Sequence, residues 1–186
     1  MPARDIYHDA VKNALVKDGW TITDDPLHLK WGIKDMYVDL GAERLLAAEK
    51  GLKLRLDIAE SDATVRFDEY CLQSALTNLL DNAIKFTDRG EIVLGLNRDS
   101  SGTLNLEVRD TGIGIDGDYL PRLFEPFSQE QAGHSRRFEG AGLGLAFARK
   151  CVELGGARIS AASRKGEGST FTIAFPRGCE IRRRRS

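Results

Sequence analysis

The stretch "TNLLDNAIKFT", residues 77–87, decides the interpretation of the fold because it joins an apolar helical face to an unusual polar margin. Projected at about 100° per residue, the helix has one narrow apolar sector. That sector contains Leu72, Leu76, Leu79, Ala83 and Phe86. Asn78, Asn82 and Lys85 lie side by side at its margin, where an amide oxygen suits Mg2+ and an ammonium suits phosphate. Taken alone, this helix fits an ordinary solvated polar face equally well.

The sequence on both sides of this helix alternates between strand and helix patterns. Asp68 is its predicted N-cap. Alternating apolar residues predict strands over 20–23, 35–40, 52–60, 63–67, 90–99, 102–110, 157–163 and 169–175. Helical spacing predicts helices over 5–18, 42–50, 68–87 and 143–154. Antiparallel strands with interleaved helices predict an α+β fold, a two-layer α/β sandwich.

Composition excludes several classes of protein. With 186 residues and a net charge of -1, the chain can bury one sizeable core and has no bulk field for nucleic acid, which is not an expected partner. The end "IRRRRS" is interpreted as a solvated basic tail. Cys71, Cys151 and Cys179 have neither metal-ligand nor disulfide spacing, which indicates a reducing compartment. No membrane segment or signal peptide is visible, so a cytoplasmic protein is predicted.

Two glycine clusters favour a nucleotide site. In "DTGIGI", Asp110 ends a strand, and Gly112 and Gly114 allow a sharp turn close to a flat ligand. A carboxylate there can accept a hydrogen bond from the amine of adenine. In "GAGLGLA", residues 140–146, backbone N–H groups at a helix start suit phosphate. This is neither a Walker A loop nor a Rossmann fingerprint, and each cluster alone is ambiguous.

Five ordered motifs together are specific. "NLLDNAIKFT", "DTGIGI", "LFEPFSQ", "GAGLGLA" and "GSTF" resemble the N, G1, F, G2 and G3 boxes of the histidine-kinase ATP-binding domain, a member of the GHKL superfamily. The resemblance covers about residues 48–176. It implies a Bergerat fold, in which a largely antiparallel sheet has helices on one face and ATP lies between the long helix and a lid.

The resemblance also implies an adenine pocket. In it, Asp110 would accept the adenine amine, Phe86 would line the pocket, and Gly112 and Gly114 would shape it. Thr170 matches a position near adenine.

For the phosphates and Mg2+, the resemblance implies Asn82 as the metal ligand. Asn78 is its polar companion and Lys85 a phosphate contact, both assigned catalytic roles. The remaining phosphate-binding positions are Arg137, Gly140, Gly142, Leu143 and Gly144. Arg136 beside Arg137, and the lid residues Phe124 and Phe127, fit solvation or core anchoring as well as a ligand role.

Asn78 distinguishes kinase from ATPase chemistry. ATPases of this superfamily typically have a water-activating Glu there, whereas Asn lacks a basic lone pair near neutral pH. We therefore expect a sensor histidine kinase catalytic domain that transfers the γ-phosphoryl of ATP to a His on a dimerisation domain in another chain, with a response regulator downstream. A regulatory ATP/Mg2+ module, a weak GHKL ATPase and a DNA-associated remnant remain alternatives.

The three histidines of the chain are poor candidates for the phosphoacceptor. His8 precedes an acid on a predicted helix but lacks a long partner helix, while His28 and His134 lie in predicted loops.

The first 50 residues resemble a different family. "ARDIYHDAVKNALVKDGWTITDDPL" with "KDMYVDLGAERLLAAEKG" resembles the start of XisH proteins, excision-controlling factors with a restriction-endonuclease-type fold. Asp39 matches its first metal acid and Asp57 follows on the next strand, but Ala59 stands where a lysine belongs, so an inert nuclease is expected. The predicted domains are 1–50 (XisH-like, incomplete), 51–178 (ATP-binding) and 179–186 (basic tail). Their junction fits recombination, fusion or a designed chimera.

Overall fold

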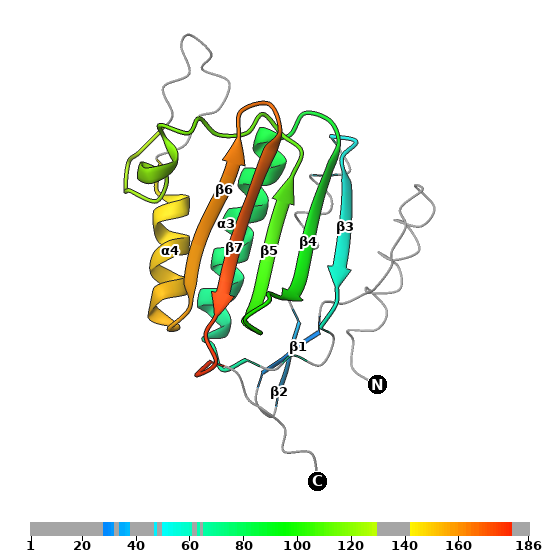
Figure 1. Cartoon of the computed structure of the whole chain (residues 1–186), viewed down its shortest axis with the longest axis vertical. Helices are drawn as coiled ribbons and strands as arrows, with labels where there is room; N and C mark the ends of the chain where they lie inside the picture. Colours follow the sequence, from blue (N-terminus) through cyan, green and yellow to red (C-terminus); the bar gives the residue numbers. More distant parts are fainter. Residues whose placement is uncertain are drawn as a thin grey trace.

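A mixed five-stranded sheet with two helices on one face forms the main body of the structure (Figure 1). This computed structural model describes residues 28–31, 34–37, 47, 50–60, 63, 65–129 and 142–179. The strands of the sheet are β3 (Lys53–Ile58), β4 (Glu91–Arg98), β5 (Leu104–Asp110), β6 (Arg158–Arg164) and β7 (Gly168–Phe175). Their order is β3-β4-β5-β7-β6, with only β3 and β4 parallel. The predicted α+β two-layer sandwich is confirmed.

The long helix α3 (Glu69–Phe86) begins and ends where the sequence predicts. The Asp68 side chain accepts a hydrogen bond from Cys71 N at 2.8 Å, and Glu69 in the first turn suits the positive end of the helix dipole. One face of the helix is buried. Its members are Leu72, Ala75, Leu76, Leu79, Leu80, Ala83 and Ile84. Because α3 connects the parallel strands β3 and β4, it is the crossover that such a pair requires.

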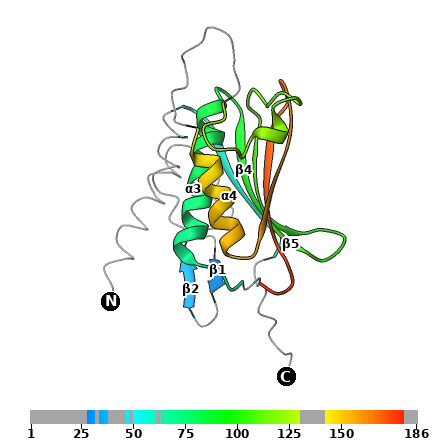
Figure 2. The same ribbon diagram turned by 90° about the vertical axis from the view of Figure 1, so that its left-hand side faces the viewer.

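The second helix, α4 (Gly144–Leu154), packs beside α3 on the same face of the sheet (Figure 2). Alternate residues of β5 and β7 point into the layer between sheet and helices, and this layer contains two aromatic pairs. Phe67 meets Phe175 edge to face with centroids 5.6 Å apart, and Phe124 meets Phe171 at 6.5 Å. Phe124 therefore anchors the core, one of its two predicted roles.

Two local predictions are wrong. In the segment 63–67, the described residues 63 and 65–67 form no strand but a single bridge at Val65, and Arg66 N donates to Cys179 O at 2.6 Å. His28, predicted in a loop, begins strand β1 (His28–Trp31), which pairs antiparallel with β2 (Lys34–Tyr37); each strand ends in an aromatic residue of a type that favours strands. The predicted elements at 5–18 and 20–23 lie outside the described residues. Among the described helices, none is long and apolar enough to cross a bilayer.

Candidate functional site

Asp110 is the polar centre of the site, at the last position of β5. Its side chain is 8% exposed, and Oδ1 accepts hydrogen bonds from Gly112 N at 2.9 Å and from Ser169 N at 3.3 Å. Burial raises the pKa of the Asp110 carboxyl above its usual value, and the donors of Gly112 and Ser169 offset part of this rise. A buried carboxylate held by backbone donors is a fixed acceptor for an amine such as that of adenine.

The loop after Asp110, residues 111–115, is called the glycine loop and lies between α3 and the turn that joins β6 to β7. A side chain on Gly112 would strike the Phe86 carbonyl and lie 2.8 Å from Thr87 Oγ1. Gly114 has φ +64°, and a side chain there would collide with the Arg164 carbonyl. Ile113 fastens the loop on both sides, donating to Phe86 O at 3.1 Å and accepting from Gly166 N at 2.8 Å. Both predicted glycines are therefore required by close approach.

The three polar side chains at the margin of α3 are half-buried, as the helical projection predicts. Asn78 Nδ2 donates to Ser74 O at 2.8 Å, and Asn78 Oδ1 faces the start of α4, only 2.6 Å from where a Gly144 side chain would begin. Lys85 Nζ lies 5.3 Å from the centroid of the Phe86 ring, within reach of a cation–π contact. Asn78 thus lies where α3 meets the start of α4, and a side chain in place of Gly144 would require the Asn78 amide to shift.

The start of α4 has the features of an anion site. Leu143, the N-cap, gives no side-chain capping bond, so within the described residues the first N–H groups of α4 lack the usual cap and can face an anion. Gly142 has φ +67° and its carbonyl accepts from Phe127 N at 3.0 Å, which joins the two ends of the predicted lid. Phe127 itself has φ +60°, rare for an aromatic residue, and its side chain is 74% exposed.

Thr170 does not join this group. In β7 it pairs with Arg109 and lies on the open face, among Arg55, Asp57 and Glu91 around a cavity of about 320 Å³. Ser169 is the residue that faces Asp110, because strand neighbours point to opposite faces. The alternation of buried Phe171, Ile173 and Phe175 could have identified Ser169, since it continues the same face.

One buried hydroxyl near the glycine loop has no partner. Thr87 is fully buried, and within the described part of the chain its Oγ1 makes no hydrogen bond. The predicted phosphate residues Arg137 and Gly140, with Arg136, His134 and His8, lie outside the described residues. Phe86 and Lys85, in contrast, stand beside the glycine loop at the end of α3.

Comparison with known proteins agrees with this geometry. Residues 67–178 match the family model described as histidine kinase-, DNA gyrase B- and HSP90-like ATPase. The chain belongs to this family. Residues 1–70 match the model of the XisH protein. The strand β3 lies in that second range, yet it pairs with β4 of the ATPase-type sheet.

Curated relatives narrow the subfamily. A sensor-like histidine kinase of Rhizobium meliloti is 42% identical over 130 residues, covering 70% of this chain and 25% of the relative. The sensor histidine kinase RcsC of Escherichia coli is 47% identical over 109 residues, covering 59% of this chain and 11% of RcsC. The chain therefore spans a quarter or less of these relatives. Its ATPase-type domain is the ATP-binding catalytic domain of sensor histidine kinases, as the motifs predict.

Solved structures show the same architecture. A solved structure of the mycobacterial sensor histidine kinase MprB superimposes with a TM-score of 0.61 at 24% identity, covering 75% of this chain and 91% of the solved MprB chain. Full-length ShkA in complex with AMPPNP gives a TM-score of 0.61 at 25% identity, covering 90% of this chain and 35% of ShkA.

Proposed function

We propose that this protein transfers the γ-phosphoryl group of ATP to a histidine on a dimerisation domain carried by another chain. The position of Asn78 carries the proposal. Its amide is bonded to Ser74 and faces Gly144, and it has no basic atom for activating water near neutral pH. A bound triphosphate is therefore better placed for a nucleophile from outside, and transfer would rest on positioning and charge stabilisation.

The described residues offer one consistent position for the nucleotide. The adenine amine would donate to Asp110, with Ser169 supporting that carboxylate, and the phosphates would lie toward the uncapped start of α4. Lys85, at the end of α3, would supply a positive charge near the phosphates.

Asn82 would hold Mg2+, with Asn78 one turn away. Among the described residues no group of three or more His, Cys, Asp or Glu side chains forms a metal site. Neutral amides fit an ion that keeps several waters and shares phosphate oxygens with few protein ligands. When bound, Mg2+ would neutralise developing phosphate charge.

An exposed apolar surface supports an external acceptor. Leu143, the residue before α4, and Phe147, one turn into the helix, are 43% and 46% exposed, and Leu154 at the end of α4 is 69% exposed. Phe127 lies next to them, because its N–H donates to Gly142 O just before α4. We propose that these four residues bind the two-helix dimerisation hairpin that bears the phosphoaccepting histidine, because an apolar face of a hairpin helix can pack against exposed apolar side chains. A response regulator would take the phosphoryl group onward.

The chain's own histidines do not supply the acceptor in this proposal. His28 lies in strand β1, whereas a phosphoacceptor of this kind stands on a helix. We therefore propose that the protein alone is not autophosphorylated, and that it acts in the cytoplasm, where ATP is available.

The pairing of β3 with β4 also bears on the domain boundaries. It supports an ATP-binding domain that begins near residue 51, after an incomplete XisH-like segment and before the basic tail at 179–186.

The test uses labelled ATP, Mg2+ and a separately purified dimerisation hairpin from a sensor histidine kinase. We expect acid-labile label on the hairpin's histidine, and none with Asn82→Ala. Phe147→Asp should lose transfer while keeping nucleotide affinity, whereas Tyr70→Asp, also at an exposed aromatic residue (71%), should behave as wild type. Nucleotide binding without transfer would instead support the regulatory module. Steady phosphate release that Asn82→Ala abolishes would support a GHKL ATPase.

A further inference from the structure

The C-terminal end of α3 is held by two donors that come from distant parts of the chain. Lys50 Nζ donates to Ile84 O at 2.6 Å and to Lys85 O at 3.3 Å. Ile113 N, in the glycine loop, donates to Phe86 O at 3.1 Å. The last carbonyls of a helix have no partner inside it, and these bonds supply partners from other segments of the chain.

The backbone conformation at the end of α3 leaves its last carbonyls open to donors from other segments. Thr87, the C-cap, has extended backbone angles (φ -111°, ψ 114°), so the helix does not end in the left-handed glycine motif that usually satisfies its carbonyls. A Lys ammonium at this end also interacts favourably with the helix dipole, and a short bond from a charged donor is stronger than a neutral one.

Lys50 is positioned by the fold on both sides. Ala47 is fully buried, and its carbonyl accepts from Leu52 N at 2.9 Å. Lys53 N then donates to Gly90 O at 3.0 Å, which ties the start of β3 to the turn after α3. The backbone around Lys50 is therefore fastened to the core and to the turn that follows the same helix.

We infer that Lys50 is a positioning residue for the nucleotide site. By holding the Ile84 and Lys85 carbonyls, it fixes the last turn of α3, which carries the Lys85 and Phe86 side chains and supports the glycine loop through Phe86 O. The segment before β3 is thereby linked to the nucleotide site. This inference rests on the proposed function, because it assumes that adenine nucleotide binds beside this turn.

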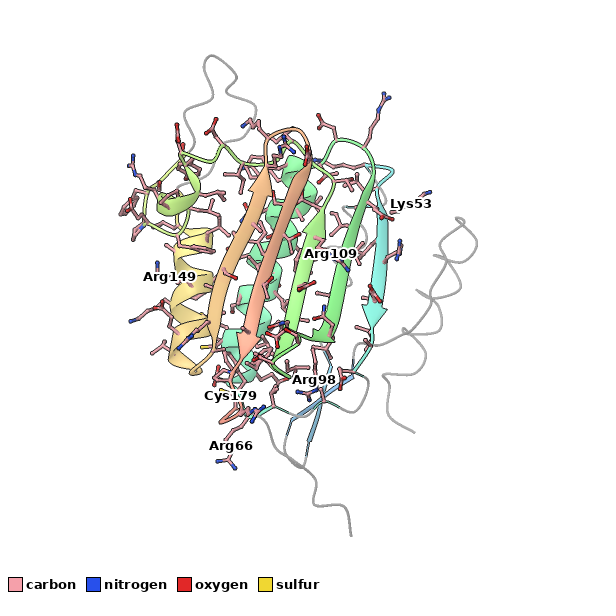
Figure 3. The ribbon with its side chains drawn as sticks, in the orientation of Figure 1. Lys53, Arg66, Arg98, Arg109, Arg149 and Cys179 are labelled. Atoms are coloured by element: carbon pink, nitrogen blue, oxygen red, sulfur yellow. The ribbon has the colours of Figure 1, made fainter. Side chains whose placement is uncertain are left out.

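The experiment measures the Kd for ADP with Mg2+ by calorimetry, using the full chain. Lys50→Met keeps the apolar stem and removes the charged donor, and we expect about fivefold weaker binding, the size of one helix-terminus interaction. Lys50→Arg restores a charged donor and should recover most of the affinity. Lys53→Met is the matched control, because Lys53 is exposed on the edge strand β3 and is labelled at that edge in Figure 3.

Kinetics with a saturating dimerisation hairpin separate positioning from a merely structural role. Lys50→Met should raise the KM for ATP about fivefold and leave kcat nearly unchanged, because the turn is restored once nucleotide is bound. Equal ADP affinity of Lys50→Met and Lys53→Met would overturn the inference, as would equal weakening by Lys50→Met and Lys50→Arg. If Lys50→Met does not fold, Lys50→Gln replaces it, and we expect the same changes in ADP affinity and in the KM for ATP. Absence of ADP binding in the wild-type protein would overturn the proposed function itself.

Discussion

The two faces of the sheet carry similar polar residues in opposite environments. Asp110, on the helix side, is 8% exposed and accepts backbone donors. Arg109, the preceding residue, lies on the open face (Figure 3), where it pairs with Asp57 at 3.3 Å and Glu107 at 3.9 Å. Exposed pairs gain little free energy in a high dielectric, whereas a buried carboxylate must be matched by specific partners. Two neighbouring residues of one strand therefore differ in role: Arg109 forms solvated ion pairs, whereas Asp110 is a buried acceptor.

The largest effect expected from this difference concerns stability. Leu106, 1% exposed, faces the helices, and Leu106→Ala should lower the free energy of unfolding by about 3 kcal/mol through lost burial and a residual cavity. Glu107→Ala, one residue along, should cost only about 0.5 kcal/mol, because its ion pair is partly exposed. Urea denaturation of both variants measures this. Equal losses would show that the open face is as closely packed as the covered one.

The next effect concerns nucleotide binding. Asp110→Asn should weaken ADP binding about 10- to 100-fold, because the adenine amine then faces a neutral amide, which is a weaker acceptor than a carboxylate and can also present its NH2 group. Arg109→Gln should leave ADP affinity as in the wild type, since Arg109 lies on the opposite face. Calorimetric titration of both proteins compares them. A strong loss with Arg109→Gln would mean that the open-face cavity, and not the covered face, takes the nucleotide.

A smaller effect distinguishes the two hydroxyl residues at the start of β7. Ser169→Ala keeps the backbone N–H that donates to Asp110 and removes only the hydroxyl, whose hydrogen bond lowers the pKa of Asp110. We expect this variant to weaken ADP binding about fivefold. Thr170→Val, whose position faces Arg109, should not change it. The same titration measures both. The reverse order of the two effects would restore Thr170 as the adenine-side residue.

The smallest effect is a pH dependence of stability. Burial raises the pKa of Asp110, so between the unfolded value, about 4, and the higher folded value the folded protein binds more protons. The free energy of unfolding should therefore fall as pH rises through that window, and Asp110→Asn should reduce this fall. Asp99 is the opposite case, because a hydrogen bond from the Ser101 hydroxyl lowers its pKa and stability is lost as pH falls through the folded value. Urea midpoints measured from acid to neutral pH give the slope of stability against pH. Asp110→Asn and Asp99→Asn should change this slope in opposite directions.

Much of the fold was predictable because its signals are local. Asp68 as N-cap, the apolar stripe of α3 and the β4–β5 hairpin all follow from the residues concerned and their near neighbours. The segment 63–67 misled the prediction, since its apolar residues are buried without a long strand partner and Arg66 N bonds to Cys179 O instead. A pattern of apolar residues reports burial more reliably than it reports hydrogen-bond pairing.

The sequence alone determined which chemical groups are available: an acid after a strand, amides one turn apart on a helix, and glycines that permit a sharp turn. These properties depend on residue type and local spacing, so no knowledge of distant contacts was needed. Only the tertiary structure decided that Ser169 lies opposite Asp110 in the neighbouring strand, that Asn78 meets Gly144, and that Lys50 forms a hydrogen bond to the end of α3. Each of these contacts joins residues tens of positions apart, and which residues meet is set by sheet register and helix packing.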